Sequence, residues 1–122
     1  MAKIFVVDDE VIITKIIEGL VKDEGYQVTS VNNSWAAIEK IKEETPDVIL
    51  LDIMMPKVNG VELCKMIKAK SDIKQIPVIM ISVLSDKGTQ NDSFNAGAED
   101  FLVKPIQKRK LLKKLDSIIK SQ

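Results

Sequence analysis

The stretch Val48–Asp52, which reads VILLD, decides the fold, because four consecutive branched apolar residues end at a carboxylate. A strand with one face in water alternates apolar and polar side chains, whereas a strand buried on both faces is apolar without interruption. Ile4–Val7 and Val78–Ile81 have the same continuous apolar character, and Phe101–Val103 is a shorter run of this kind. These runs predict the strands of a parallel sheet that helices cover.

Apolar residues at helical spacing fill the intervals between the predicted strands. They recur every three or four positions over Val11–Val21, around Ala37–Ile41, over about Val61–Lys70 and from near Pro105 onward. The more polar stretch Gln27–Val31 is a fifth strand candidate that suits a sheet edge. Strand and helix alternate over the 122 residues, which predicts one doubly wound α/β domain with helices on both faces of a five-stranded sheet.

The interval at residues 85–96 gives weak support to the helix that alternation requires there. Gly, Thr, Asn, Asp and Ser dominate it, and each costs about 0.5–1 kcal/mol relative to Ala within a helix. Phe94 is the main apolar anchor that this helix would offer to the sheet. We therefore expect a short or frayed helix that opens locally at lower cost than the sheet.

The composition excludes several classes of function. Lys plus Arg and Asp plus Glu number 18 each, so the net charge is zero and nucleic acid is not an expected partner. The chain has no histidine, which excludes Ser-His-Asp catalysis and His-ligated zinc. The single cysteine, Cys64, excludes an intramolecular disulfide and favours a cytoplasmic location. No apolar stretch approaches the ~20 residues of a membrane span, so membrane insertion is not expected.

Polar residues follow the core strands at their carboxyl ends, where doubly wound sheets bind ligands. In chain order these residues are Asp8, Asp9 and Glu10, then Asp52, then Ser82, then Lys104. Clustered carboxylates repel one another, and a divalent cation relieves that repulsion. Oxygen ligands without His or Cys select a hard ion, so the sequence predicts Mg²⁺ at this edge of the sheet.

Each of these residues, taken singly, also has an ordinary structural explanation. Asp8 and Asp9 suit a helix cap, Asp52 suits a turn, and serines and lysines are common at strand ends. A phosphate cradle for a nucleotide is a further alternative, but that site needs glycines and hydroxyls after the first strand, where this chain has three acidic residues. The joint placement of the set at the strand ends favours a functional site.

Asp52 beside Mg²⁺ has a definite chemical use. A carboxylate in that position attacks a phosphoryl group and becomes an aspartyl phosphate, while the cation neutralises charge on the phosphoryl oxygens. Lys104 is suited to pair with one remaining oxygen, and the Ser82 hydroxyl is suited to hydrogen-bond another.

Five ordered motifs identify the family that the sequence resembles. They are Val6–Glu10, Asp47–Gly60 (DVILLDIMMPKVNG), Ile81–Ser82, Ala96–Phe101 and Val103–Pro105. The sequence resembles the receiver domain of bacterial two-component response regulators over essentially its whole length, residues 1–122. This resemblance, and not the apolar pattern, implies the flavodoxin-like strand order 2-1-3-4-5.

The resemblance also implies a role for each matching residue of the metal site. Asp52 is expected to be the phospho-acceptor. Asp9, Asp52 and the backbone carbonyl of Met54 are expected to bind Mg²⁺, with Asp8 acting mainly through metal-bound water.

Other matching residues are expected to respond to the phosphoryl group. Ser82 and Lys104 would hold it, and Phe101 matches a switch aromatic that turns inward when Ser82 moves toward the phosphate. The family often has a cis bond before the proline that matches Pro105.

The resemblance implies a phosphorylation-dependent switch rather than an enzyme, although the switch assists its own phosphotransfer and dephosphorylation. A histidine kinase or phosphotransfer protein would supply the phosphoryl group, and a downstream protein, an effector domain or a second copy of the chain would contact the altered surface. Two alternatives stay open. A hydrolase of the phosphatase group needs a second Asp where this chain has Met54, and an unphosphorylated interaction module does not need the intact strand-end set.

Overall fold

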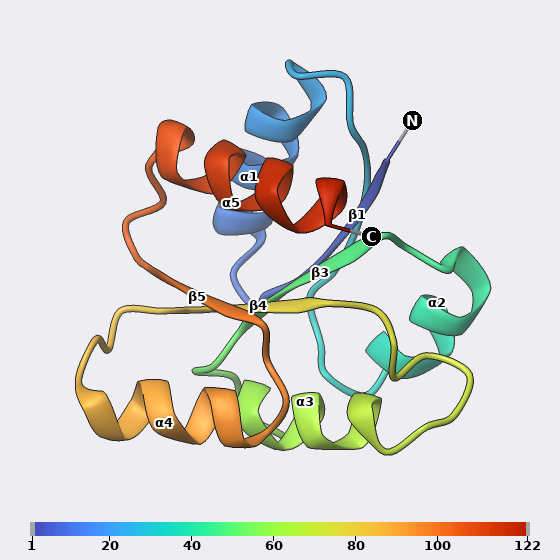
Figure 1. Ribbon diagram of the computed structural model, residues 1–122, viewed down its shortest axis with the longest axis vertical. Coiled ribbons are helices and arrows are strands. Elements are labelled where there is room, and N and C mark those ends of the chain that lie inside the picture. Colours follow the sequence, from blue (N-terminus) through green and yellow to red (C-terminus); the bar gives the residue numbers. More distant parts are fainter. Residues whose placement is uncertain (1, 122) are drawn as a thin grey trace.

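The computed structural model describes residues 2–121, and in that range the chain forms five strands and five helices that alternate (Figure 1). The strands are β1 (Lys3–Val7), β2 (Gln27–Val31), β3 (Val48–Asp52), β4 (Val78–Ser82) and β5 (Asp100–Val103). The helices are α1 (Val11–Lys22), α2 (Ala37–Glu44), α3 (Gly60–Lys68), α4 (Lys87–Asn95) and α5 (Lys108–Lys120). The alternation confirms the predicted doubly wound α/β architecture. The last helix begins a few residues later than the apolar pattern indicates.

All five strands pair in parallel in the order β2-β1-β3-β4-β5, which confirms the order that the family resemblance implies. The central register pairs Ile4 with Val48 and Leu50 with Ile79. The three central strands therefore end close together at the same edge of the sheet. The weaker candidate Gln27–Val31 is an edge strand, as its polar content predicts.

Helices α1 and α5 cover one face of the sheet, and α2, α3 and α4 cover the other (Figure 1). Successive residues of a strand point to opposite faces, so a continuous apolar run supplies both cores. Ile49 packs on the side of Leu63 in α3, whereas Leu50 packs on the side of Ile17 in α1. Every residue of β3 and β4 is buried, which explains why these two strands give the clearest signal in the sequence.

The expectation for the fourth helix is wrong about its anchor. Helix α4 has nine residues, as many as α3. Phe94 is 45% exposed and is not its anchor; the buried residue of the helix is Ser93, with Ala96 buried just beyond its end. The physical reason is helical phase, because Ser93 and Ala96 share the inward face and Phe94 projects beside it. The ease of local opening stays a prediction.

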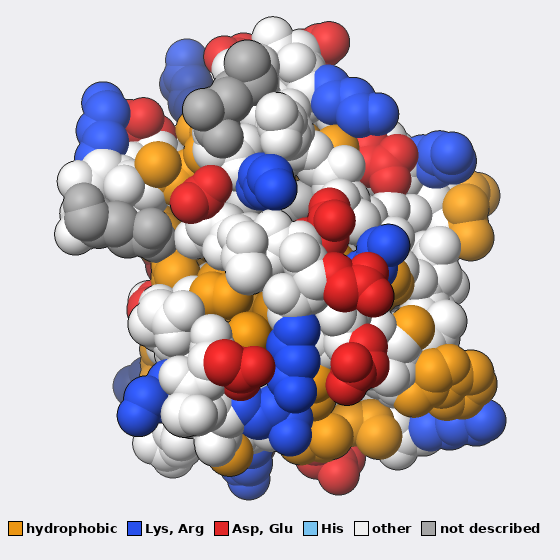
Figure 2. Space-filling model, turned by 90° about the vertical axis from the view of Figure 1, so that its right-hand side faces the viewer, with side chains coloured by type: hydrophobic (Ala, Val, Ile, Leu, Met, Phe, Trp, Pro, Cys, Tyr) orange, Lys and Arg blue, Asp and Glu red, His pale blue; other side chains and the backbone are white. Residues whose placement is uncertain are grey.

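Charged side chains of both signs are intermixed on the surface that carries α2, seen from the right-hand side of Figure 1 (Figure 2). This distribution agrees with the net charge of zero. In the described part of the chain, no helix combines the length and the apolar character that a membrane span requires.

Candidate functional site

The carboxyl ends of the central strands bring the predicted residues together. Asp8 follows β1, Asp52 ends β3 and Ser82 ends β4, and these three side chains are almost completely buried. Lys104 follows β5 and reaches across the sheet edge toward β1 and β3. Ligand sites of doubly wound sheets form at this edge, where the direction of winding reverses.

Lys104 joins two of the carboxylates. Its Nζ donates a hydrogen bond to Oδ2 of Asp8 at 3.1 Å and lies 3.1 Å from Oδ1 of Asp52. The second contact is an ion pair without hydrogen-bond alignment, and Oδ1 of Asp52 has no hydrogen-bond partner among the described residues. Glu10 lies at the margin of the cluster, 3.9 Å from the same ammonium. The buried Oδ1 of Asp52 is thus attracted by the Lys104 ammonium but accepts no hydrogen bond from the described residues.

The backbone fixes where the ammonium starts. The Lys104 N–H donates to the carbonyl of Ser82 at 2.8 Å, so the two residues leave neighbouring strands side by side. The peptide bond between Lys104 and Pro105 is cis, as the resemblance predicts.

The pKa of Asp52 is raised from an ordinary 3.8 to about 6. Burial is the largest cause of this rise, and the neighbouring Asp8 carboxylate is the second. The Lys104 ammonium opposes both effects. Burial lowers the pKa of Lys104, but its contacts with Asp52 and Asp8 outweigh burial and leave that pKa raised. Near neutral pH Asp52 is therefore largely ionised while its charge remains poorly solvated.

The acidic residues after β1 form the group that is best placed to hold a metal. One carboxylate oxygen from each of Asp8, Asp9 and Glu10 lies within 4.8 Å of the others. Asp52 is not part of this group, although the sequence predicts it as a ligand together with the Met54 carbonyl. The donor set is all oxygen, and the unpartnered Oδ1 of Asp52 is buried beside Asp8 through their shared lysine, so the residues fit a hard divalent cation.

Asn32, which the sequence reasoning did not single out, holds the backbone of Asp8 in place. The amide of Asn32 donates to the Asp8 carbonyl at 2.9 Å and also to the hydroxyl of Thr14 at 3.3 Å. The backbone N–H of Glu10 donates to Oδ1 of Asp8 at 2.9 Å. A polar residue directly after an edge strand was the available signal for Asn32.

Gly60 supports the end of β3 from the far side of the loop. Its N–H donates to the Ile53 carbonyl at 2.9 Å. A Cβ at this position would collide with the Asp52 carbonyl oxygen and would come within 2.8 Å of the Asp52 carbonyl carbon. Only glycine lets the start of α3 approach this closely, so this position and Asp52 are sterically coupled.

The residues expected to switch lie in the interior. The Ser82 hydroxyl is fully buried, and its oxygen accepts a hydrogen bond from the Leu84 N–H at 3.0 Å. Phe101 is 8% exposed and belongs to the core on the side of α3 and α4, so its ring already points inward.

The family model described as the response regulator receiver domain matches residues 4–116, and the chain belongs to that family. It is therefore a phosphorylatable signalling domain of two-component systems, a class of switch proteins. The chemotaxis protein CheY of Listeria monocytogenes is 36% identical over 121 residues, which cover 98% of this chain and 100% of that protein. The probable transcriptional regulator ycf27 of Guillardia theta is 35% identical over 97% of this chain, but the match spans only 45% of that protein.

Solved structures give the same result for the fold. Chemotaxis protein CheY4 of Vibrio cholerae superposes with a TM-score of 0.92 at 30% identity, covering 97% of this chain and 98% of that one. The receiver domain of sensor histidine kinase PA1611 from Pseudomonas aeruginosa, which has a magnesium ion coordinated in its active-site cleft, gives a TM-score of 0.88 at 26% identity over 97% of each chain.

Proposed function

We propose that this chain, as a receiver domain over residues 1–122, accepts a phosphoryl group on Asp52 from a phosphohistidine partner and passes the change to a downstream protein by contact. The observation that carries the proposal is the Asp52 carboxylate itself. It is buried, keeps one oxygen without a hydrogen-bond donor, and is paired with Lys104. Such a group is suited to act as a nucleophile because no donor among the described residues holds that oxygen by a hydrogen bond.

The transfer makes one bond and breaks one. A carboxylate oxygen of Asp52 attacks phosphorus, and the P–N bond to the partner's imidazole breaks with its electron pair going to the ring nitrogen. Asp8, Asp9 and Asp52 would hold Mg²⁺ with the Met54 carbonyl, and Glu10 is close enough to assist. The bound cation supplies charge neutralisation for the phosphoryl oxygens.

Lys104 is placed to pair with a phosphoryl oxygen after the transfer. Its ammonium lies 3.1 Å from both Asp8 and Asp52, so only a small movement is needed to pair with a phosphoryl oxygen bound to Asp52. The Ser82 oxygen accepts from the Leu84 N–H, which leaves its O–H free to donate to another phosphoryl oxygen. Phe101 is in the core next to β4, so its packing changes when Ser82 moves. Water later hydrolyses the acyl phosphate without a separate catalyst.

The partners follow from this chemistry. A histidine kinase or phosphotransfer protein supplies the phosphoryl group in the cytoplasm, and the changed surface recruits a target protein, an effector domain or a second copy of the chain. Nucleic acid is not a direct partner in this proposal, because the chain carries no net positive charge.

Labelling with acetyl phosphate and Mg²⁺ tests the proposal. Mass spectrometry should find one acid-labile phosphoryl group on the wild type and none on Asp52→Asn. Asp116→Asn is the matched control, because that carboxylate lies on α5 and pairs with Lys120 at 3.1 Å, away from the strand ends. Equal labelling of wild type and Asp52→Asn, or labelling that survives removal of Mg²⁺ by a chelator, would contradict the proposal.

A further inference from the structure

Lys57 and Asp9 line the same small cavity but do not pair with each other. The cavity, of about 100 Å³, is lined by Asp9 and by residues 32–35 and 55–57. Both charged residues are exposed, and Asp9 is one of the proposed Mg²⁺ ligands. Among residues 2–121, the Lys57 ammonium forms no ion pair with any carboxylate. An ammonium group beside an acidic cluster therefore has another partner.

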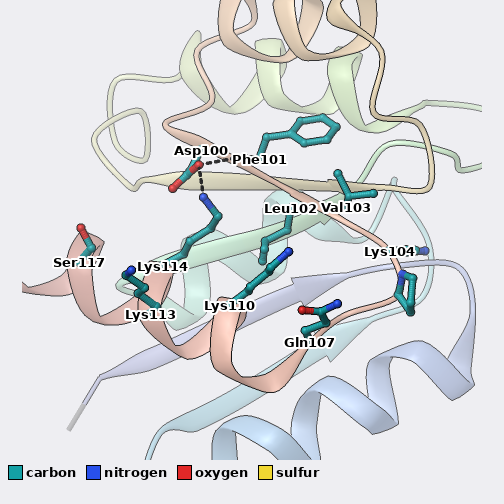
Figure 3. Close-up of a pocket in the computed structure, with 11 residues that line it drawn as sticks. Asp100, Phe101, Leu102, Val103, Lys104, Gln107, Lys110, Lys113, Lys114 and Ser117 are labelled. Atoms are coloured by element: carbon teal, nitrogen blue, oxygen red, sulfur yellow. Dashed lines mark hydrogen bonds and ion pairs between the residues drawn. The ribbon is translucent and has the colours of Figure 1, made fainter.

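Exposure alone does not keep a lysine of this protein from a neighbouring carboxylate. In the open groove of about 650 Å³ between β5 and α5, the Lys114 ammonium lies 2.9 Å from Oδ1 of Asp100 (Figure 3). Both side chains of that pair are 32% exposed, yet they stay together. The separation of Lys57 from Asp9 therefore has a more specific cause than contact with solvent.

The ring of Trp35 takes the place of a carboxylate partner. The Lys57 ammonium lies 4.2 Å from the centroid of this ring, within the range of a cation–π interaction. Trp35 is 65% exposed, so burial in the core does not account for its position. A cation–π contact and an ion pair have similar strengths at a protein surface, so the ring is able to compete with Asp9 for the ammonium.

The backbone supports this contact from both sides of the cavity. The turn before α2 carries Trp35, and there the side chain of Asn33 accepts the Ala36 N–H at 2.9 Å. In the loop between β3 and α3, Lys57 has a φ of 69°, a left-handed conformation that few residues other than glycine adopt. The loop thus carries backbone strain at the residue whose side chain reaches the ring.

We propose that Trp35 is a positioning residue for the cation site, because its ring holds the Lys57 ammonium away from the Asp9 carboxylate and leaves that carboxylate available to Mg²⁺. Without the ring, the ammonium pairs with Asp9, and Mg²⁺ has to displace it. The inference rests on the metal site proposed above. It adds to that site a residue that contributes no ligand atom and yet sets the affinity for the cation.

A purely mechanical contact is the competing explanation, because Lys57 lies in the same loop as Met54, whose carbonyl is a proposed Mg²⁺ ligand. If the contact only holds this loop in place, loss of Trp35 and loss of Lys57 weaken Mg²⁺ binding equally. If the ring holds the ammonium away from Asp9, only loss of Trp35 weakens binding, and additional loss of Lys57 restores it. The two explanations therefore differ in the sign of the effect of the lysine.

A double-mutant cycle over the two residues is the test. NMR titration with MgCl₂, near neutral pH and at constant ionic strength, gives the dissociation constant from the amides that follow β1 and β3. Trp35→Leu should raise this constant roughly threefold, the size of effect of an exposed ion pair. Lys57→Met should not raise it, and Trp35→Leu combined with Lys57→Met should match Lys57→Met alone. Trp35→Phe keeps a ring face and should lose less affinity than Trp35→Leu.

Lys40→Met is the matched control, because this lysine lies on α2 and pairs with Glu43 at 3.6 Å. Combined with Trp35→Leu, it should not restore the affinity for Mg²⁺. The difference between Trp35→Leu and wild type should also shrink at high salt, which screens exposed charges.

Three results would overturn the inference and leave the proposed metal site intact. They are an unchanged dissociation constant in Trp35→Leu, a raised one in Lys57→Met, and a double variant that binds as weakly as Trp35→Leu. A wild-type protein that does not bind Mg²⁺ would overturn the proposed metal site, and the inference with it.

Discussion

Helices α3 and α4 lie on the same face of the sheet, have nine residues each, and begin with a side-chain cap. Asn59 accepts the Glu62 N–H at 3.0 Å, and Asp86 accepts the Thr89 N–H at 3.0 Å. Their interiors differ completely. Helix α3 buries Gly60, Leu63, Cys64 and Ile67, whereas α4 buries Ser93 alone.

The difference shows that a helix can form without an apolar stripe, but that it then depends on local hydrogen bonds. The Ser93 hydroxyl donates to the Thr89 carbonyl inside α4, and the Cys64 thiol donates to the Ala96 carbonyl just after it. These contacts position α4 without burying much surface. Apolar burial supplies most of the free energy that docks a helix, so α3 should be firmly held and α4 loosely held.

The largest effect should come from replacing one apolar side chain in each of the two helices by alanine. Leu63→Ala removes a fully buried side chain and should lower the free energy of unfolding by about 2–5 kcal/mol. Phe94→Ala removes a side chain that is 45% exposed and should lower it by less than about 1 kcal/mol. Urea unfolding of both variants measures this. Similar losses would break the comparison.

Amide hydrogen exchange should separate the helices next. Amides of residues 87–95 should exchange roughly a hundredfold faster than those of α3, since each 1.4 kcal/mol of opening free energy is about tenfold in rate. Phosphorylation at Asp52 should slow exchange in α4 through Ser82. Protection of α4 comparable to that of β3 in the unphosphorylated protein would show that α4 is already firmly docked.

The third prediction concerns the destabilising effect of the buried Asp52 charge, in contrast to the weak packing of α4. Its folded-state pKa is raised to about 6, so the folded protein binds this proton more tightly than the unfolded chain, and stability falls as pH rises from 3.8 to 6. With a metal chelator present, the free energy of unfolding of Asp52→Asn relative to wild type should therefore rise by roughly 2 kcal/mol between pH 3.8 and pH 6. Unfolding curves at several pH values test this, and a gap that is independent of pH would contradict it.

The caps should matter unequally. Asp86→Ala should speed amide exchange across α4, whereas Asn59→Ala should have a smaller effect on α3, because buried apolar residues still hold that helix. Asp86→Asn retains a capping oxygen and serves as the control. Equal effects of the two alanine variants would mean that α4 has other anchors.

The smallest effect concerns the loops that lead into the helices. Met54, Val83 and Leu84 expose 57%, 62% and 41% of their surface near the strand ends, and apolar groups there hinder an attacking water. Val83→Ala should speed loss of the phosphoryl group by a factor of roughly three, about 0.7 kcal/mol of barrier. Decay at the wild-type rate would show that the loop before α4 does not control water access.

The sequence predicts the sheet well because β3 and β4 are buried on both faces, and continuous apolar runs leave little choice of structure. It identifies Asp8, Asp52, Ser82 and Lys104 because residues at strand ends must meet at one edge. It predicts α4 only through the alternation of strands and helices, and it gives the wrong anchor, because the helical phase turns Ser93 inward and Phe94 outward. Nor does it reveal the role of Asn32, because a polar residue after an edge strand is a weak signal and does not show that its amide bonds the Asp8 carbonyl.

Because of Gly60, the positions where substitution abolishes function include a residue that takes no part in the chemistry. Any side chain at this position would push on the Asp52 backbone, and the displaced strand end would carry the carboxylate away from Lys104. A genetic screen for loss of signalling would therefore return Gly60 substitutions together with those of the phospho-acceptor. Such variants should lose phosphorylation as Asp52→Asn does, although the glycine itself contributes no group to the reaction.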